Sequence, residues 1–243
     1  MSSFRTCFLL ASLLLTMASC AARQDVDVEP RSSRLVLSPG LWVEPDARRL
    51  GFRAWVCLDE GWLEQVVCGP GTREHESLMV SDVPASGIHA GLLLLGLEPG
   101  RPGRWREEGA AVVALPPQGP GVRVAVRWID ESGRERSDGV DGWIRDVSDG
   151  ASFPTDRWIF AGSIELDGRD AEQAGVRYLA DRSGSIIGLV TFGDELLAAG
   201  DVIPDAADVH APEWIAATSA VPPVGTEVTV ELSVVGPDQT AAE

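Results

Sequence analysis

The sequence contains no lysine and no asparagine, so arginine alone makes up its 20 basic side chains. Without lysine the chain has no amine for a Schiff base, no Ser–Lys pair, and no lysine of the kind that binds phosphate in P-loop proteins and kinases. Histidine and tyrosine are also scarce, with 3 His and 1 Tyr, which is Tyr178. These absences leave few catalytic arrangements open to the chain.

Several common catalytic and metal-binding motifs are missing as well. The sequence has no H-E-x-x-H, no C-x-x-C and no G-x-S-x-G motif. The common signatures of zinc proteases, thiol oxidoreductases and serine hydrolases are therefore absent. The sequence implies no cofactor, and whether the protein binds a metal stays an open question at this point.

The charge balance is strongly acidic. The 37 Asp and Glu residues outnumber the 20 basic residues, and the formal net charge is −17. Such a charge keeps a domain soluble but repels phosphate backbones and anionic headgroups. We therefore expect no nucleic-acid partner, and we expect any contact with a membrane to be made through an anchor.

The N-terminus has the pattern of a bacterial lipoprotein signal. Arg5 precedes an apolar run from Phe8 to Met17, and small residues then lead to Cys20. An apolar run of about ten residues is too short to cross a bilayer and is typical of a cleaved export signal. We expect cleavage before Cys20 and attachment of lipid to this cysteine.

This pattern predicts a division of the chain into four parts. Residues 1–19 form the signal peptide, residues 20–33 the lipidated cysteine and a flexible tether, residues 34–236 the globular domain, and residues 237–243 a frayed tail. The absence of Asp after Cys20 favours the outer membrane, facing the periplasm. The alternative is ordinary cleavage, which would release a soluble periplasmic or extracellular protein.

The pattern of apolar residues predicts an α+β fold: a strand-rich single domain of antiparallel hairpins with one main helix near 84–95. Residues 50–58 alternate, Glu60-Gly61 forms a turn, and residues 62–68 return, which is typical of a hairpin. Residues 226–235 alternate again, and the two prolines ahead of them favour an edge strand.

Cys57 and Cys68 are the two cysteines left after the signal and the lipid site. In the predicted hairpin their Cα atoms lie about 14 Å apart, at a rise of ~3.4 Å per residue. A disulfide needs a Cα separation of about 4.4–6.8 Å. The predicted register therefore argues against a disulfide between them and favours two buried thiols.

The most polar candidate site follows Cys68. His75, Glu76 and Ser77 lie in the segment 69–77, and His89 comes early in the predicted helix. Imidazole and carboxylate groups can transfer protons or bind a divalent metal if these segments meet. The alternative interpretation is structural: His75 and Glu76 fix the loop by hydrogen bonds, and His89 packs in the helix.

A series of short motifs resembles the YdjY-domain family of bacterial proteins, which are often exported or lipoprotein-like. The motifs are Val56-Cys57-Leu58, Glu74-His75-Glu76-Ser77-Leu78, Ile88-His89-Ala90, Trp158-Ile159-Phe160 and Tyr178-Leu179-Ala180-Asp181, within residues 40–201. The resemblance implies a fold and an envelope location, but no established activity. Relatives with iron–sulphur segments carry cysteine runs that this chain lacks.

Two functions follow from these observations. The first is an envelope-anchored lipoprotein, a non-enzymatic binding or scaffold module whose partner is an envelope protein or a small molecule. The alternative is a metal-binding protein or hydrolase-type enzyme centred on His75, Glu76 and His89, with Cys68 as a further candidate.

Overall fold

The computed structural model of the protein describes residues 33–109, 111–153, 158–205 and 210–235. They belong to one compact unit, Ser32–Glu243. The predicted signal peptide, Cys20, nearly all of the tether and the tail at 237–243 lie outside the described residues. Of the helices among the described residues, none is long and apolar enough to cross a membrane.

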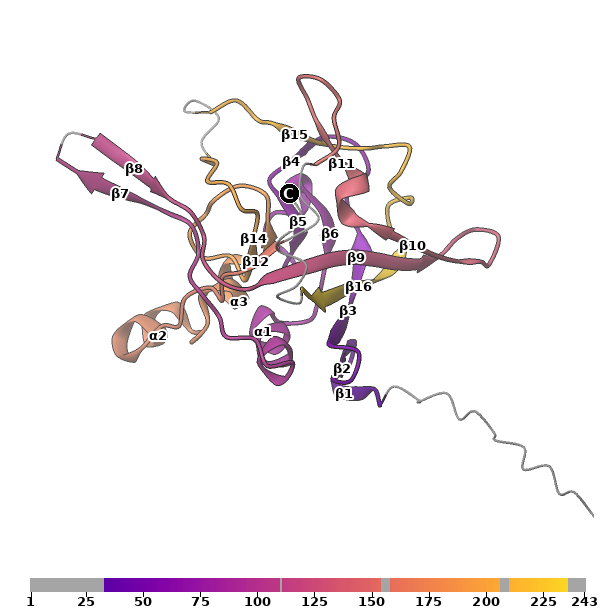
Figure 1. Cartoon of the computed structure of the whole chain (residues 1–243), viewed down its shortest axis with the longest axis horizontal. Helices are drawn as coiled ribbons and strands as arrows, with labels where there is room; N and C mark the ends of the chain where they lie inside the picture. The colour runs from indigo at the N-terminus through magenta and orange to yellow at the C-terminus, as the bar shows by residue number, and fades with distance from the viewer. Residues whose placement is uncertain (1–32, 110, 154–157, 206–209, 236–243) are drawn as a thin grey trace, which may run out of the picture. The chain divides into compact units, whose positions relative to one another are not determined.

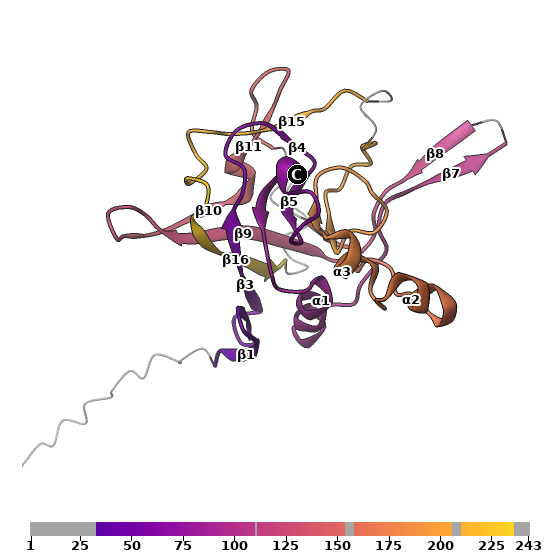
Figure 2. The same ribbon diagram turned by 180° about the vertical axis from the view of Figure 1, so that it is seen from behind.

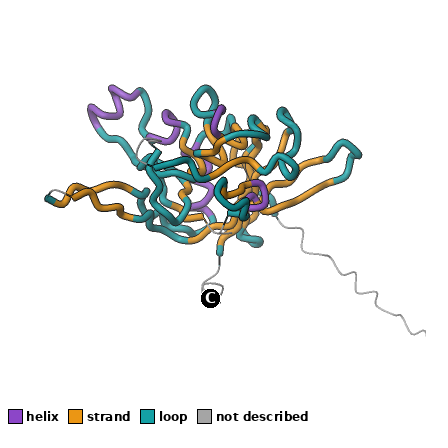
Figure 3. Tube along the Cα trace, turned by 90° about the horizontal axis from the view of Figure 1, so that it is seen from above, coloured by secondary structure: helices purple, strands orange, loops and turns teal. Residues whose placement is uncertain are grey.

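Strands make up most of the regular structure (Figures 1 and 3). The strands are β1 Leu35–Ser38, β2 Leu41–Glu44, β3 Arg49–Val56, β4 Trp62–Leu63, β5 Gln65–Cys68, β6 Ser77–Val80, β7 Arg104–Glu108, β8 Ala111–Leu115, β9 Gly121–Ile129, β10 Glu135–Gly139, β11 Ile144–Asp146, β12 Trp158–Phe160, β13 Ser185–Gly188, β14 Leu197–Ala198, β15 Trp214–Ala216 and β16 Glu227–Val234. The helices are α1 Ala85–Leu94, α2 Gly168–Ala174 and α3 Leu179–Ser183, with short 3-10 turns at Glu74–Glu76 and Val140–Trp143.

Most of the described strands belong to one large sheet, in the order β1-β2-β3-β16-β9-β12-β14-β13-β5-β6. Strand β3 also pairs with β6, through Trp55 opposite Val80 and Val56 opposite Met79. The pairings from β3 around to β6 therefore close on themselves. Closure leaves the strands of this ring without a free edge, which protects them from pairing with other chains.

Every second side chain of β16 points into the space that the closed ring of strands encloses. The strand pairs with β3 on one side and β9 on the other. Its inward residues and their partners on the two neighbouring strands are apolar and nearly all buried: Val228, Val230 and Leu232 with Leu50, Phe52, Ala54, Val124, Val126 and the partly buried Trp128. Since successive side chains point to opposite faces of a strand, one alternating sequence supplies one buried face.

Helix α1 packs against β2, β3 and the short helix α3. Figure 2, which shows the protein from behind, again places α1 beside α3. The side of α1 that meets the sheet is buried at Ile88, Gly91 and Leu92, whereas Leu93 and Leu94 are exposed. The helix ends at Leu94, and Gly96 follows its C-cap with a φ of 80°, a left-handed conformation that favours glycine.

The predicted α+β class is wrong, because the protein is mostly β. A helix does lie at Ala85–Leu94, close to the expected 84–95, but within the described residues it is one of three short helices, and these form no separate layer there. The sheet is also not built of antiparallel hairpins alone: β5 pairs with β6, and β13 with β14, in parallel. All four residues of β5 are buried, so both faces of this strand are covered, as is usual for strands in parallel pairs.

Two strand predictions are corrected as well. Residues 50–58 and 62–68 do not pair with each other: β3 pairs with β2, β16 and β6, while β4 pairs with β15 and β5 with β13 and β6. The final strand β16 is central in the sheet and not at an edge. The hairpin prediction failed because the alternation of a strand shows which side chains share a face but not which strand pairs with it. The edge prediction failed because the two prolines lie before β16, where they remove no hydrogen bond from the sheet.

Candidate functional site

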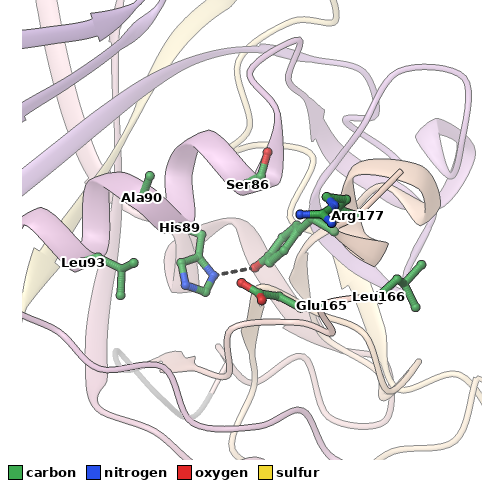
Figure 4. A pocket seen from close by; sticks show the side chains of 8 residues that line it. Ser86, His89, Ala90, Leu93, Glu165, Leu166 and Arg177 are labelled. Atoms are coloured by element: carbon green, nitrogen blue, oxygen red, sulfur yellow. Dashed lines mark hydrogen bonds between the residues drawn. The ribbon is translucent and has the colours of Figure 1, made fainter. Parts of the chain in front are cut away.

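A cavity of about 360 Å³ lies between helix α1 and the segment around residues 165–178. Its size is within the usual range for small-molecule sites. It is lined by Ser86, His89, Ala90, Leu93, Glu165, Leu166, Arg177 and Tyr178 (Figure 4). The cavity thus combines an apolar wall with an imidazole, a phenol and one charge of each sign.

The imidazole of His89 is held by a chain of two hydrogen bonds. Its Nδ1 lies 2.8 Å from the phenolic oxygen of Tyr178, and the Tyr178 hydroxyl donates to the carbonyl oxygen of Gly162 at 2.8 Å. Because the single phenolic proton goes to Gly162, the phenolic oxygen must accept from Nδ1–H of His89. This assignment leaves Nε2 as the acceptor, and no residue that the structure describes hydrogen-bonds to Nε2.

The surroundings favour the neutral form of His89. Burial lowers its pKa below the ordinary value, while the negative charge of Glu165 acts in the opposite direction. Phe160 and Tyr178 pack edge-on against the ring, with centroids 5.0 and 5.3 Å away. A neutral ring with a fixed tautomer presents one basic nitrogen, which can accept a hydrogen bond or a proton from a bound molecule.

An unusual backbone supports this arrangement. Gly162 and Ser163 have φ of 86° and 55°, and a positive φ is strained for serine. The Ser163 hydroxyl offsets this strain by donating to the carbonyl oxygen of Asp194 at 2.6 Å and accepting from the amide of Ala180 at 3.2 Å. The strained turn directs the Gly162 carbonyl toward Tyr178.

The charged groups of the cavity come from two paired segments. Glu165 and Tyr178 form an isolated β-bridge, and the amide of Leu166 donates to the carbonyl oxygen of Arg177 at 2.7 Å. Both Glu165 and Arg177 are exposed. A carboxylate and a guanidinium therefore border the same cavity and are free to meet a ligand of matching charge.

The structure does not bring His89 together with the other predicted site residues. His75 is exposed, with 77% of its side chain accessible, and its Nε2 lies 3.5 Å from Glu76. Glu76 lines a separate cavity of about 60 Å³ together with Glu64. Burial, and next the charge of Glu76, raise the pKa of Glu64 to about 7.

The other predicted residues have structural contacts. The Ser77 hydroxyl donates to the carbonyl oxygen of Arg73 at 2.6 Å, and Cys68 is fully buried at the end of β5. Of the predicted set, His89 alone lines the larger cavity. Among the described residues, no group of three or more His, Cys, Asp or Glu side chains could hold a metal ion.

Sequence reasoning missed Glu165, Arg177 and Tyr178 as partners of His89. Tyr178 and Asp181 stand together in one of the motifs shared with the YdjY proteins, and Tyr178 is the single tyrosine of the chain. These signals mark the residue, but they do not indicate its contact with a histidine that lies 89 positions earlier. The side chain of Asp181 also accepts from the amide of Ser86 at 2.9 Å and so caps helix α1.

Fold and site together define a mostly β domain with a cavity of ligand size beside an oriented histidine. A family model described as the YdjY domain matches residues 41–233, and the chain belongs to the YdjY-domain family. The match extends beyond the resemblance seen in the sequence and includes the central strand β16. Neither the curated proteins nor the solved structures include a match to the chain.

Proposed function

We propose that this protein is an envelope-anchored lipoprotein whose folded domain binds a small polar molecule in the cavity beside His89. The anchor is supported by the N-terminal pattern that ends at Cys20. Binding is supported chiefly by one observation: His89 is oriented by Tyr178 within a cavity of about 360 Å³. A non-enzymatic role is favoured because the lining offers a base but no nucleophile hydrogen-bonded to it.

The chemistry of the lining suggests the class of ligand. Nε2 of neutral His89 accepts a hydrogen bond, Arg177 attracts an anionic group, and Glu165 attracts a cationic one. Leu93, Ala90 and Leu166 contribute apolar surface. We infer that a small zwitterion with a modest apolar side chain, such as an amino acid or a short peptide, fits this combination better than a neutral sugar.

Calorimetric titration of the purified protein with a panel of amino acids, dipeptides and neutral monosaccharides tests the binding. We expect binding of one or more zwitterions, with at least tenfold weaker affinity in His89→Ala and Arg177→Ala. His75→Ala is the matched control, because His75 is exposed and lies outside the cavity. Equal weakening in His75→Ala, or no heat from any zwitterion, would contradict the proposal.

The anchor is tested separately. Mass spectrometry of the exported protein should find a mature chain that begins at an acylated Cys20, and Cys20→Ser should abolish both the acylation and the cleavage. A mature chain without acyl groups would show that the protein is released after ordinary cleavage. This outcome would remove the anchor but leave the binding site intact.

A further inference from the structure

Strand β1 and the end of helix α1 carry a group of exposed apolar side chains. Leu35, Val36 and Leu37 of β1 are 49%, 73% and 37% exposed, and Leu94 in the last turn of α1 is 59% exposed. We call these four side chains the β1–α1 patch. Three consecutive apolar residues that all face water are unusual in a soluble domain and indicate a surface that meets a partner.

The four side chains form one surface because β1 packs against α1. Figures 1 and 2 place both elements on the same side of the protein. Leu35 lies opposite the buried Val43 in the β1–β2 ladder, so the two share one face of the sheet. A Cβ atom at Gly91 of α1 would lie 3.5 Å from Cδ1 of Leu37, and Leu94 follows Gly91 by three residues, on the same side of the helix.

Pairing with a strand of a second copy fits this surface poorly. Among the described strands, β1 ends the sheet and pairs with β2 alone. Its ladder with β2 has an irregular register between Val36 and Ser38. Irregularities of this kind twist an edge strand and hinder its pairing with another chain. The patch therefore offers apolar side chains to an apolar phase more readily than it offers backbone groups to another strand.

The chain enters the folded domain beside this patch. The described chain begins at Ser33, two residues before Leu35, and Ser33 follows Cys20 by 13 residues. A stretch of this length spans at most about 45 Å when it is fully extended. A lipid on Cys20 would therefore hold the start of β1 within about 45 Å of the membrane surface.

The local charge also suits a membrane surface. Residues 34–49 contain three Arg and two acidic residues, which gives a net charge of +1, whereas the whole chain carries −17. Helix α1 contains no Asp, Glu or Arg. The guanidinium of Arg34 lies 3.9 Å from the ring centroid of Trp42. Arg and Trp side chains are typical of membrane interfaces, because each combines an apolar part with a polar group.

We propose that the β1–α1 patch docks on the bilayer that holds the anchor, with its four apolar side chains inserted among the lipid headgroups and the first part of the acyl chains. This inference rests on the proposed acylation of Cys20, which keeps the patch close to the membrane. Burial of the patch removes apolar surface from water. Docking thereby fixes the orientation of the domain, with β1 and α1 facing the bilayer.

A footprint made by photoreactive lipids tests the docking. The acylated mature protein is reconstituted in phosphatidylcholine vesicles that contain a lipid with a diazirine in its acyl chain, irradiated and digested with trypsin. Trypsin releases residues 35–48, which include β1, and residues 74–104, which include the end of α1, because Arg101 precedes a proline and is not cleaved. We expect lipid adducts on residues 35–37 and on Leu94.

Val112 of strand β8 is the matched control position. Its side chain is 65% exposed, so it is as accessible as the patch, but it lies in the β7–β8 hairpin. Trypsin releases it in the peptide 107–123. If apolar exposure alone produced adducts, this peptide would carry as many as the patch, and that result would overturn the proposal.

Variants test whether the apolar side chains cause the docking. The double substitution Val36→Ser and Leu94→Ser should lower the adduct yield at Leu35 and Leu37 by at least about tenfold, since burial of each large apolar side chain contributes about a tenfold factor. Val112→Ser should leave the yield unchanged. A soluble dimer that Val36→Ser dissociates would show that a second copy covers the patch, and would overturn the proposal. The wild-type footprint decides the question even if the double variant fails to fold.

The intact mass of the mature protein reports the anchor independently of the footprint. An acylated protein without adducts on the patch would keep its anchor and lose the docking surface. If the mass shows no acyl groups, the proposed anchor fails. A chain that begins at Cys20 is then coupled through this thiol to a lipid with a maleimide headgroup, and the same footprint is expected. Absence of adducts with this substitute anchor would overturn the docking surface as well.

Discussion

The imidazole Nδ1 of His89 and the phenolic oxygen of Tyr178 lie 2.8 Å apart and join helix α1 to a segment that follows 89 residues later. The contact does two things. It fixes the tautomer of His89, and it ties the wall of the cavity to the strained turn at Gly162 through the second hydrogen bond of Tyr178. The geometry of the cavity therefore depends on one hydroxyl group.

Removal of this hydroxyl in Tyr178→Phe should destabilise the protein by about 1–3 kcal/mol, because a buried donor and a buried acceptor lose their partner. It should also release the tautomer of His89, which ¹⁵N NMR of the imidazole detects as a loss of the Nδ1–H preference. Thr226→Val is the control, since it removes a hydroxyl that donates one exposed hydrogen bond, to the carbonyl oxygen of Pro223. An unchanged nitrogen spectrum in Tyr178→Phe would refute the tautomer assignment.

Two glycines of helix α1 should respond oppositely to alanine. At Gly91, a Cβ atom would overlap the buried Cδ1 methyl of Leu50, whereas at Gly87 it would lie 3.4 Å from Leu41, an ordinary contact. We expect Gly91→Ala to cost about 1–3 kcal/mol by overpacking. We expect Gly87→Ala to stabilise the fold by about 0.5–1 kcal/mol, through the better helix propensity of alanine. Urea unfolding measures both, and stabilisation by both substitutions would show that the helix is not held close to β3.

The buried carboxyl of Glu195 should make stability depend on pH. It is fully buried, it accepts from the amides of Phe192 and Gly193, and its second oxygen has no partner within the described chain. Burial raises its pKa from 4.5 to about 7. The folded state therefore holds the proton more tightly than the unfolded state, so stability falls as the pH rises from 4.5 to 7 and stays low above it.

At about 1.4 kcal/mol for each pKa unit, this loss is on the order of 3 kcal/mol. Glu195→Gln should remove it, so the variant gains stability relative to wild type at pH 8 but not at pH 4. The measurement is chemical unfolding of both proteins at the two pH values. A difference between the proteins that is the same at pH 4 and pH 8 would show that Glu195 titrates normally.

Some of the fold could be predicted from local sequence. Helix α1 was expected near residues 84–95, because an apolar run there ends at Gly96 and is followed by Pro99. The last strand was expected from its alternation, which matches the buried face of β16. Sequence could not identify the residue that caps α1, because Asp181 comes from a different helix and not from a neighbouring position.

The candidate site was predicted only in part. His89 was recognised, but it was grouped with His75 and Glu76, which are near it in sequence and line no part of its cavity. Its real partner, Tyr178, belongs to a segment that meets α1 only after the sheet has formed. Sequence spacing cannot indicate such a contact, because a loop of many residues can close in many ways at similar entropic cost.

The sequence by itself determined the acidic charge, the absence of lysine chemistry, the export pattern ending at Cys20 and the membership in the YdjY-domain family. These follow from composition and from local motifs. Only the tertiary structure decided that β3 pairs with β6 and that His89 meets Tyr178. The reason is that backbone hydrogen bonds are alike in every strand, so the choice of partner depends on how all the side chains pack together.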